Sequence, residues 1–371
     1  MRAVGEEFHR GHGTILSLNG YLAIAQVKPV PHAGPMTKNT ASQPAEPTKS
    51  TEPTEPTEPT MKAIRQDALG DPDVLREVEV ARPKPSVGQI LVAVHAAGVN
   101  PTDWKHRRFG AFLGEPPFTL GWDVSGVVEA VGIGVSLFQP GDEVFGMLPY
   151  PYGAGSHAEY VTGPTRAFVP RPAGLSHIEA GALPLVSLTA WQALVDNAHV
   201  EPGQRVLVHA AAGGVGHVAV QIAKARGAYV IGTASAAKHD FVRGLGADEV
   251  IDYRSADFVK EARDIDVVLD PLGGDDRLRS LEVLRPGGIL VSILPGNFGD
   301  VAERAAALGV RATDMLVEHD QAGMAAVAAL AESGQLRVHV SDTYPLADAA
   351  KAHAQGETGR VTGKLVLTVR P

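Results

Sequence analysis

The fold of this chain is decided by Arg205-Val-Leu-Val-His-Ala-Ala-Ala-Gly-Gly-Val-Gly-His-Val-Ala-Val220. The stretch begins as a short apolar strand, passes through a glycine turn and continues as an amphipathic helix. Its spacing A-x-x-G-x-x-G is a variant of the dinucleotide-binding fingerprint. Small residues let the backbone approach a pyrophosphate, and the helix N-terminus directs free N–H groups at it. The alternative is a tight turn without a ligand. The predicted cofactor-binding residues here are Ala210, Gly213, Gly214, Val215 and Gly216.

The strand that follows this helix bears on the choice of dinucleotide. A site for NAD usually has an acidic residue about 20 residues after the glycines, where it binds the ribose 2′-hydroxyl. This chain instead has Gly232-Thr-Ala-Ser235, followed by Lys238. A hydroxyl and an ammonium favour a 2′-phosphate, and no carboxylate repels it. The sequence therefore predicts NADPH, bound by Ser235 and Lys238; the alternative is that Lys238 is a solvated residue of the next helix.

Composition limits the class of protein. The chain has 371 residues, of which 44% are hydrophobic and 20% are charged, as in an ordinary globular protein of two domains. A formal net charge of −9 argues against a nucleic-acid partner. The absence of cysteine excludes disulfides, thiolate metal sites and cysteine nucleophiles. No apolar run is long enough for a membrane span, so we expect a cytoplasmic protein.

The chain divides into a tail and three further parts. Residues 1–60 contain the repeat Thr51-Glu-Pro-Thr-Glu-Pro-Thr-Glu-Pro-Thr60, which cannot bury enough apolar surface to order itself. We expect a disordered tail, with Met61 as the true start or the first residue of the fold. Residues 61–185 have short strands between turns and predict a β-rich domain. Residues 186–333 alternate strands and helices, which predicts a doubly wound parallel sheet. Residues 334–371 end in an apolar strand that we expect to return to the first domain.

Several further motifs follow one another from Met61 onward, at Ala96–Lys105, Gly121–Gly132, Gln139–Gly146, Leu188–Leu194, Leu245–Tyr253 and Gly359–Leu367. In these motifs and their order the chain resembles the quinone oxidoreductase branch of the medium-chain dehydrogenase/reductase superfamily. The resemblance implies an α/β protein with a GroES-like catalytic domain, an inserted Rossmann domain and a cofactor cleft between them. It also implies that Thr189, Leu294 and Pro295 lie near the nicotinamide, and Tyr253 near the adenosine phosphate.

Departures from the zinc-dependent members of that superfamily bear on the chemistry. Where they have a cysteine ligand this chain has Asn100, and where they have a His-Glu pair it has Trp122-Asp123. Catalytic zinc prefers three ligands of His, Cys or carboxylate type. We therefore expect no metal, and a hydride transfer from NADPH to a quinone or an α,β-unsaturated carbonyl compound, since a conjugated acceptor spreads the developing charge.

The loop and helix that begin at Asn100 hold the predicted catalytic residues. The anion formed by hydride transfer needs a nearby donor and then a proton. Asn100 is expected to donate to the acceptor oxygen or the ribose, Lys105 to stabilise the anion or bridge to the ribose, and Asp103 to hold Lys105 or cap the helix that follows. The alternatives are a loop-shaping Asn100, an ordinary N-cap role for Asp103 and a plain surface Lys105. Aromatic residues of this domain are candidates for the pocket wall, and the tyrosines for the proton donor: Trp104, Phe112, Trp122, Tyr150 and Tyr152.

Two other functions remain open at this point. One is an NADPH-binding redox sensor with little turnover, and the other is an enoyl reductase acting on a carrier-bound acyl chain. By analogy with the superfamily we also expect a homodimer.

Overall fold

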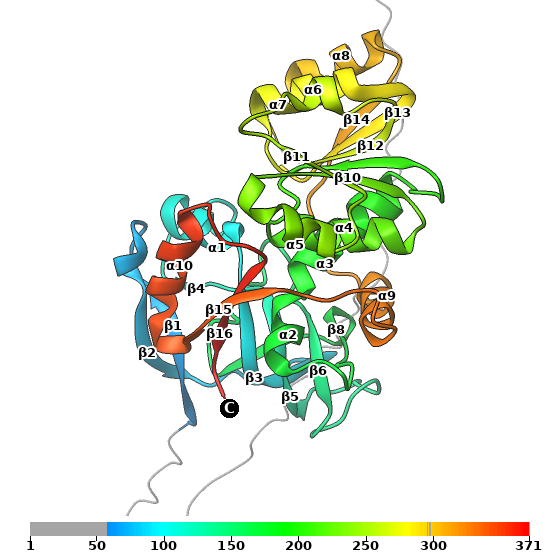
Figure 1. Cartoon of the computed structure of the whole chain (residues 1–371). Helices are drawn as coiled ribbons and strands as arrows, with labels where there is room; N and C mark the ends of the chain where they lie inside the picture. The colour runs from blue at the N-terminus through cyan, green and yellow to red at the C-terminus, as the bar shows by residue number, and fades with distance from the viewer. Residues whose placement is uncertain (1–57, 295, 297, 371) are drawn as a thin grey trace, which may run out of the picture. The chain divides into compact units, whose positions relative to one another are not determined.

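The computed structural model describes residues 58–294, 296 and 298–370. Nearly all of the expected tail, and Pro295 among the expected cofactor residues, therefore lie outside the described residues. The described chain contains a β-rich region and a parallel-sheet region, in which helices pack on a parallel sheet (Figure 1). None of its helices has the length and apolar character that a membrane span needs.

The parallel-sheet region contains 6 strands in the order β11-β10-β9-β12-β13-β14. The central strands are apolar runs that are buried on both faces, as a parallel sheet between helices requires. Strand order reverses between β9 and β12, where ligands of doubly wound sheets bind. The strands are β9 (Arg205–Val208), β10 (Tyr229–Ala234), β11 (Glu249–Asp252), β12 (Ile265–Asp270), β13 (Leu284–Ser292) and β14 (Arg311–Asp314).

Helices cover both faces of this sheet (Figure 1). On one face, side chains such as Val206 and Val230 pack with Val218 of α4. On the other, Leu207 and Ile231 belong to a separate core that includes residues of α6 and α8. The predicted doubly wound fold is confirmed. The helices are α4 (Gly214–Ala225), α5 (His239–Gly244), α6 (Phe258–Glu261), α7 (Gly274–Ser280) and α8 (Gly299–Ala307).

The β-rich region contains a sheet of 7 strands in the order β15-β16-β3-β5-β6-β8, with β7 also paired to β3, and a smaller sheet β2-β1-β4. The GroES-like β-rich fold class is confirmed. Its strands are β1 (Thr60–Gln66), β2 (Arg76–Ala81), β3 (Gln89–Val99), β4 (Phe118–Thr119), β5 (Asp123–Val131), β6 (Glu143–Met147), β7 (Tyr160–Pro164), β8 (Phe168–Pro170), β15 (Val340–Pro345) and β16 (Lys364–Thr368).

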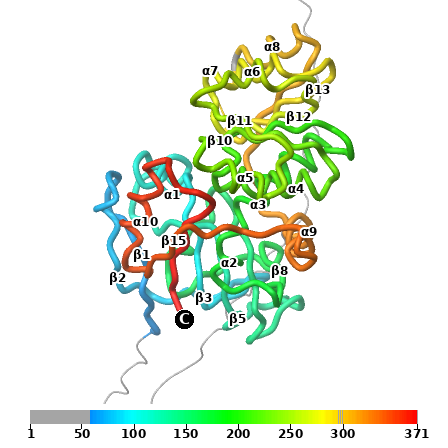
Figure 2. The backbone as a smooth tube through the Cα atoms, viewed as in Figure 1, coloured from blue at the N-terminus to red at the C-terminus, as the bar shows by residue number. Residues whose placement is uncertain are grey.

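The return of the chain to the first sheet positions the site. Strand β16 pairs antiparallel with β3, with Leu365 opposite Val99, so Lys364 lies beside the start of α1. Figure 2 shows the C-terminal end of the chain, in red, returning to the β-rich region. Asn100 ends the extended chain there because the proline that follows it fixes the first helical turn. The remaining helices are α1 (Pro101–Phe109), α2 (His177–Ala182), α3 (Pro184–Trp191), which runs into a π-helical turn (Gln192–Asn197), α9 (Gln321–Glu332) and α10 (Ala349–Glu357).

Candidate functional site

The glycine turn joins β9 to α4. Ala210 has φ +47°, and its N–H donates to Thr233 Oγ1 at 3.1 Å. Gly213 is the N-cap of α4, and no side chain caps this helix. A Cβ on Gly216 would lie 2.3 Å from the carbonyl oxygen of Ala210, so a larger residue would push the helix off the strand. The helix start therefore presents backbone N–H groups that suit an anion, as a dinucleotide pyrophosphate requires.

The β-rich region reaches the same turn through the start of β16. The N–H of Gly363 donates to the carbonyl of Ala212 at 2.9 Å. A Cβ on Gly214 would lie 3.5 Å from Cδ of Lys364. The side chain of Lys364 therefore runs directly past the start of α4 before its ammonium enters the β-rich region.

A second group of predicted cofactor residues lies at the ends of β10 and β11. Ser235 precedes a short 3₁₀ turn that contains Lys238. The Lys238 ammonium donates to the backbone carbonyls of Arg360 and Val361 at 2.9 and 3.1 Å. Burial lowers the pKa of Lys238, and a smaller effect of Tyr253 opposes that shift. Tyr253 is 56% exposed. Lys238 and Tyr253 thus lie close together in an arrangement that leaves the phenol accessible to a ligand.

Two residues expected near the nicotinamide come from different elements. Thr189 lies in α3, is 5% exposed, and donates its hydroxyl to the Leu185 carbonyl at 2.7 Å. Leu294 follows β13, at the carboxyl edge of the sheet. Its N–H donates to Ser292 Oγ at 3.2 Å. These contacts fix both residues, and their role in binding stays a prediction.

Four polar side chains form a buried network where β3, α1, β5 and β16 meet. Asn100 donates through Nδ2 to Asp123 Oδ2 at 2.8 Å and accepts a hydrogen bond from the Lys364 ammonium. The same ammonium donates to the Val99 carbonyl at 3.0 Å and lies 3.4 Å from Asp123. Asp103 Oδ2 accepts the N–H of Asn100 at 2.6 Å. All four side chains are 0–2% exposed, so the network is shielded from water.

The network holds two carboxylates but one ammonium. Burial raises the pKa of Asp103 to about 7, and the nearby Asp123 adds to that rise, while hydrogen bonds from the N–H groups of Asn100 and Gly121 oppose it. Burial also lowers the pKa of Lys364, against the attraction of both carboxylates. The network is therefore able to hold or release a proton near neutral pH at Asp103.

The predicted catalytic residues occupy different environments. Asp103 bonds the N–H groups of Asn100 and Gly121, as in the helix-capping alternative. Lys105 points away from this network and is exposed on α1. The cation that the described residues bring to Asn100 is instead Lys364, the first residue of β16. The roles of Asn100, Asp103 and Lys105 in turnover stay predictions.

Aromatic side chains gather beside the network. The Tyr150 ring lies 5.2 Å from Trp122 and 6.4 Å from Phe112, which in turn lies 6.5 Å from Tyr152. Trp122 is fully buried, whereas Phe112 is 45% and Tyr152 75% exposed. This wall leads from the surface to the buried site. Trp104 does not belong to it, because its ring packs against α10 instead.

Tyr150 begins a hydrogen-bonded chain that the sequence did not indicate. Its hydroxyl lies 3.0 Å from Thr102 Oγ1, which lies 3.1 Å from His106 Nδ1. Burial raises the pKa of Tyr150 and lowers that of His106. Both groups are therefore neutral at pH 7. The i, i+4 spacing of Thr102 and His106 on one helix was the only available sequence signal.

The residues of this site do not fit a catalytic zinc. Within residues 58–294, 296 and 298–370, no three His, Asp or Glu side chains are grouped so that they could hold a metal ion. The buried carboxylate Asp123 already faces the Lys364 ammonium, and indole is not a practical ligand at Trp122.

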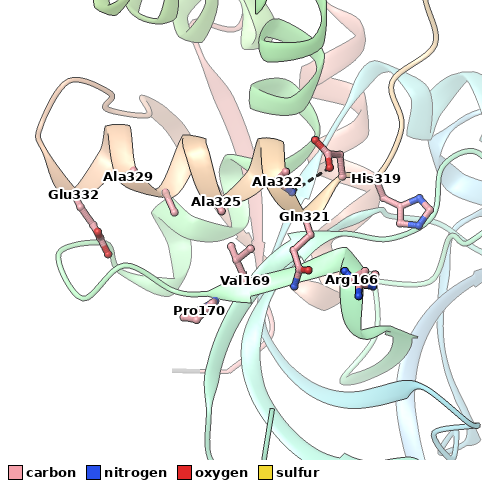
Figure 3. A pocket seen from close by; sticks show the side chains of 11 residues that line it. Arg166, Val169, Pro170, His319, Gln321, Ala322, Ala325, Ala329 and Glu332 are labelled. Carbon is pink, nitrogen blue, oxygen red and sulfur yellow. Dashed lines mark hydrogen bonds between the residues drawn. The ribbon is translucent and has the colours of Figure 1, made fainter. Parts of the chain in front are cut away.

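A large groove elsewhere on the molecule is separate from this site. It has a volume of about 800 Å³ and lies between β8 and α9 (Figure 3). Its α9 wall consists mainly of alanines, with Arg166 and His319 at one end and Glu332 at the other. None of its lining residues belongs to the glycine turn, the buried network or the aromatic wall.

The sequence of this chain matches two known protein families and is similar to known quinone oxidoreductases. Residues 86–173 match the family described as alcohol dehydrogenase GroES-like domain, and residues 245–367 match the family described as zinc-binding dehydrogenase. A quinone oxidoreductase from Pongo abelii is 34% identical over 326 residues, covering 83% of this chain and 97% of that protein.

Solved structures of quinone oxidoreductases are also similar to this chain. The quinone oxidoreductase from Coxiella burnetii has a TM-score of 0.80 at 38% identity and covers 84% of this chain and 100% of its own. The Escherichia coli quinone oxidoreductase complexed with NADPH has a TM-score of 0.75 at 29% identity, with coverage of 83% and 100%.

Proposed function

This chain belongs to the quinone oxidoreductase branch of the medium-chain dehydrogenase/reductase family, and we propose that it reduces quinones or α,β-unsaturated carbonyl compounds with NADPH and without zinc. The chain is an oxidoreductase; the cofactor, the acceptor and the metal independence are the proposal. When bound, NADPH supplies a hydride to the acceptor.

One observation carries the proposal. Strand β16 connects the glycine turn to the buried network, because Gly363 bonds the turn and the adjacent Lys364 bonds Asn100. A dinucleotide whose pyrophosphate lies at the start of α4 then has its reactive end near a buried cation. The three hydrogens of the Lys364 ammonium go to Val99, Asn100 and Asp123, so this cation acts on the acceptor through Asn100, whose amide it polarises.

The residues of the network take defined roles in this proposal. Asn100 Nδ2 carries a second hydrogen beyond the one given to Asp123, and we assign it to the acceptor oxygen or the nicotinamide ribose. Asp103 fixes the backbone of Asn100 and tunes the charge of the network. Lys105 adds a solvent-exposed positive charge one turn along the same helix.

The proton for the reduced acceptor is assigned to Tyr150. Its hydroxyl stands beside Trp122 and the aromatic wall, and Thr102 lies within hydrogen-bond distance to restore the proton. Solvent that reaches the half-buried Tyr150 then supplies the proton that this hydroxyl has lost. Tyr152, which is 75% exposed, is the weaker candidate because nothing in the described structure orients its hydroxyl.

The preference for NADPH rests on Ser235, Lys238 and Tyr253. These residues lie at or after the ends of β10 and β11. Strand β10, which follows α4, offers no carboxylate to a ribose 2′-hydroxyl. The E. coli quinone oxidoreductase complexed with NADPH supports the same choice.

A homodimer and a cytoplasmic location complete the proposal. The edge strand β14 has β13 as its one partner among the described strands, so its other edge is open to a second copy. Sedimentation of the purified protein tests the dimer, and cell fractionation tests the location.

The decisive experiment is steady-state oxidation of NADPH by the full chain in the presence of EDTA. The acceptors are an ortho-quinone, a para-quinone, a 2-alkenal and a cyclic enone, with NADH in parallel. We expect turnover of at least one acceptor with NADPH preferred. Binding of NADPH without turnover of any acceptor would favour the sensor or the carrier-substrate reductase, and loss of activity to EDTA would overturn zinc independence.

A matched pair of glycine variants links that turnover to the glycine turn. Gly213→Val places a side chain where the pyrophosphate is proposed, and should abolish NADPH binding. Gly174→Val is the control, because its Cβ would meet open space on the β-rich region. Equal activity of the two variants would move the cofactor away from α4.

A further inference from the structure

Arg277 of α7 is buried far from the network described above. Arg277 is 4% exposed, which is unusual for an arginine. Its Nε donates to Asp270 Oδ2 at 2.6 Å, and its Nη2 donates to Ser292 Oγ at 2.7 Å and to the Leu294 carbonyl at 3.3 Å. A guanidinium offers these donors in a fixed planar fork, so it sets the relative position of all three acceptors.

The three acceptors belong to neighbouring strand ends. Asp270 is the last residue of β12 and Ser292 the last of β13, and the two are register partners in the sheet. Asp270 also accepts the N–H groups of Leu272 and Gly273 through its other oxygen, at 2.9 and 2.8 Å. The chain after β12 and the chain after β13 are therefore tied to one guanidinium.

Packing at this point leaves little freedom. A Cβ on Gly273 would lie 3.3 Å from Arg277 Nη2 and 3.3 Å from Leu294 Cδ1. The Phe298 ring also lies 5.3 Å from the guanidinium carbon. Leu294 is therefore fixed at three points. Its carbonyl accepts a hydrogen bond from Arg277, its N–H donates to Ser292, and its side chain packs close to Gly273.

We propose that Arg277 is a positioning residue that fixes Leu294 against the nicotinamide half of the cofactor. The inference rests on the proposed function, in which Lys238 binds the 2′-phosphate of the adenosine half, and on the family resemblance, which implies that Leu294 borders the nicotinamide. The side-chain hydrogen bonds of Arg277 go to the ends of β12 and β13 and to Leu294, while Lys238 and Tyr253 follow β10 and β11. Loss of Arg277 should therefore weaken the binding of the nicotinamide half of the cofactor and leave the binding of the adenosine half unchanged.

The test compares two ligands on one variant. In the full chain, Arg277→Met removes the donors and keeps the length of the side chain. We expect the Kd for NADPH to rise about tenfold and kcat with a quinone to fall about tenfold, while the Kd for 2′,5′-ADP, which carries only the adenosine half, stays within twofold. Arg277→Lys should recover part of kcat.

Arg279→Gln is the matched control, two residues away on the same helix. Its guanidinium is 42% exposed and pairs with Asp257 and Asp276, away from the strand ends. This variant should match the wild-type protein in both affinities and in kcat.

Two outcomes would overturn the inference. One is an Arg277→Met protein with wild-type NADPH affinity and kcat, and the other is equal weakening of NADPH and 2′,5′-ADP, which indicates a general structural role. Should that variant fail to fold, Ser292→Ala removes one acceptor only, and it should show the same selective loss in smaller degree. Failure of the wild-type protein to bind NADPH would instead overturn the proposed function.

Discussion

Two buried cations, Lys364 in the β-rich region and Arg277 in the parallel-sheet region, lie in different chemical surroundings. Lys364 faces two buried carboxylates, and burial, with a smaller contribution from Asp123, raises the pKa of Asp103 to about 7. Arg277 faces one carboxylate, Asp270, whose pKa is lowered because hydrogen bonds from Gly273 and Arg277 outweigh the effect of burial. The first network therefore carries excess negative charge that a proton can relieve, whereas the second is balanced.

This difference matches the proposed roles of the two regions. A group that gains or loses a proton near pH 7 suits the place where chemistry creates and discharges an anion. A balanced ion pair with fixed geometry suits a place that only has to hold a loop. The predictions below test this contrast, beginning with the largest expected effect.

Removal of Lys364 should break the first network most severely. Lys364→Met leaves Asp103 and Asp123 buried without a cation, and removal of one partner from a buried pair costs about 3–5 kcal/mol. We expect that loss in the free energy of unfolding, measured by urea titration at pH 7.5. Lys351→Met, at a lysine 70% exposed, is the control and should change it by less than about 0.5 kcal/mol. A loss below about 1 kcal/mol for Lys364→Met would show that the network does not depend on the ammonium.

The pH dependence of stability should reveal the shared proton. The pKa of Asp103 is raised from 3.8 to about 7, so the folded protein binds a proton more tightly than the unfolded chain does. Protonated Asp103 then stabilises the fold at low pH, and this contribution declines as the pH rises from about 4 to 7. Between pH 5 and 7 the change amounts to about 2 kcal/mol.

Paired variants separate the contribution of Asp103 to stability from the contribution of the buried histidines. Burial lowers the pKa of His157, His209 and His217 to about 4, so these residues lower stability as the pH falls below about 6.5, opposite to Asp103. The difference between wild type and Asp103→Asn in urea titrations at pH 5, 6 and 7 cancels them. Asp270→Asn should leave the slope in this range unchanged, because the pKa of Asp270 is already lowered. Identical slopes for both variants would contradict the contrast.

Much of the fold followed from the sequence because its signals are local. The central strands of the parallel sheet, such as Arg205–Val208 and Ile265–Asp270, are apolar runs between turns, and this pattern predicted the sheet. The return of the last strand was expected because an apolar strand needs a sheet. Strands β1 and β2 were not predicted, since their alternating charged residues, such as those of Arg76–Ala81, resemble a solvated loop.

The site was harder to predict than the fold. Its partners lie far apart in sequence: Asn100 and Lys364 are 264 residues apart, and no local pattern marks them as neighbours. Lys105 was chosen because it lies close to Asn100 along the chain, but helix geometry turns it to the surface. Arg277 gave no signal either, because an arginine on a short helix is ordinarily solvated.

A smaller effect is expected at the adenosine end of the cofactor. Lys238→Ala should weaken NADPH about tenfold, or about 1.4 kcal/mol, because a charge-assisted bond to the 2′-phosphate is lost. The affinity for NADH should stay within twofold. Lys260→Ala, at an exposed lysine of α6, serves as control, and both Kd values come from fluorescence titration. Equal weakening of both dinucleotides would remove Lys238 from cofactor selection.

The smallest effect is expected at Lys105. Its ammonium is exposed, so water and salt screen its attraction for an anion in the site. Lys105→Ala should slow turnover about two- to fivefold and leave NADPH affinity and stability unchanged. Arg108→Ala, on the same helix and 52% exposed, should not slow it. Unchanged steady-state turnover in Lys105→Ala would remove that residue from the mechanism.

The sequence separation within the buried network has a consequence for synthesis. Asp123 and Lys364 are 241 residues apart, so the ribosome makes the carboxylates long before the cation that faces them. At about 5–20 residues per second the delay is roughly 10–50 seconds. During that time the nascent β-rich sheet lacks both β16 and its positive charge. The strands and helices of the parallel-sheet region, which lie between these residues in the sequence, have therefore emerged before the β-rich sheet can be completed.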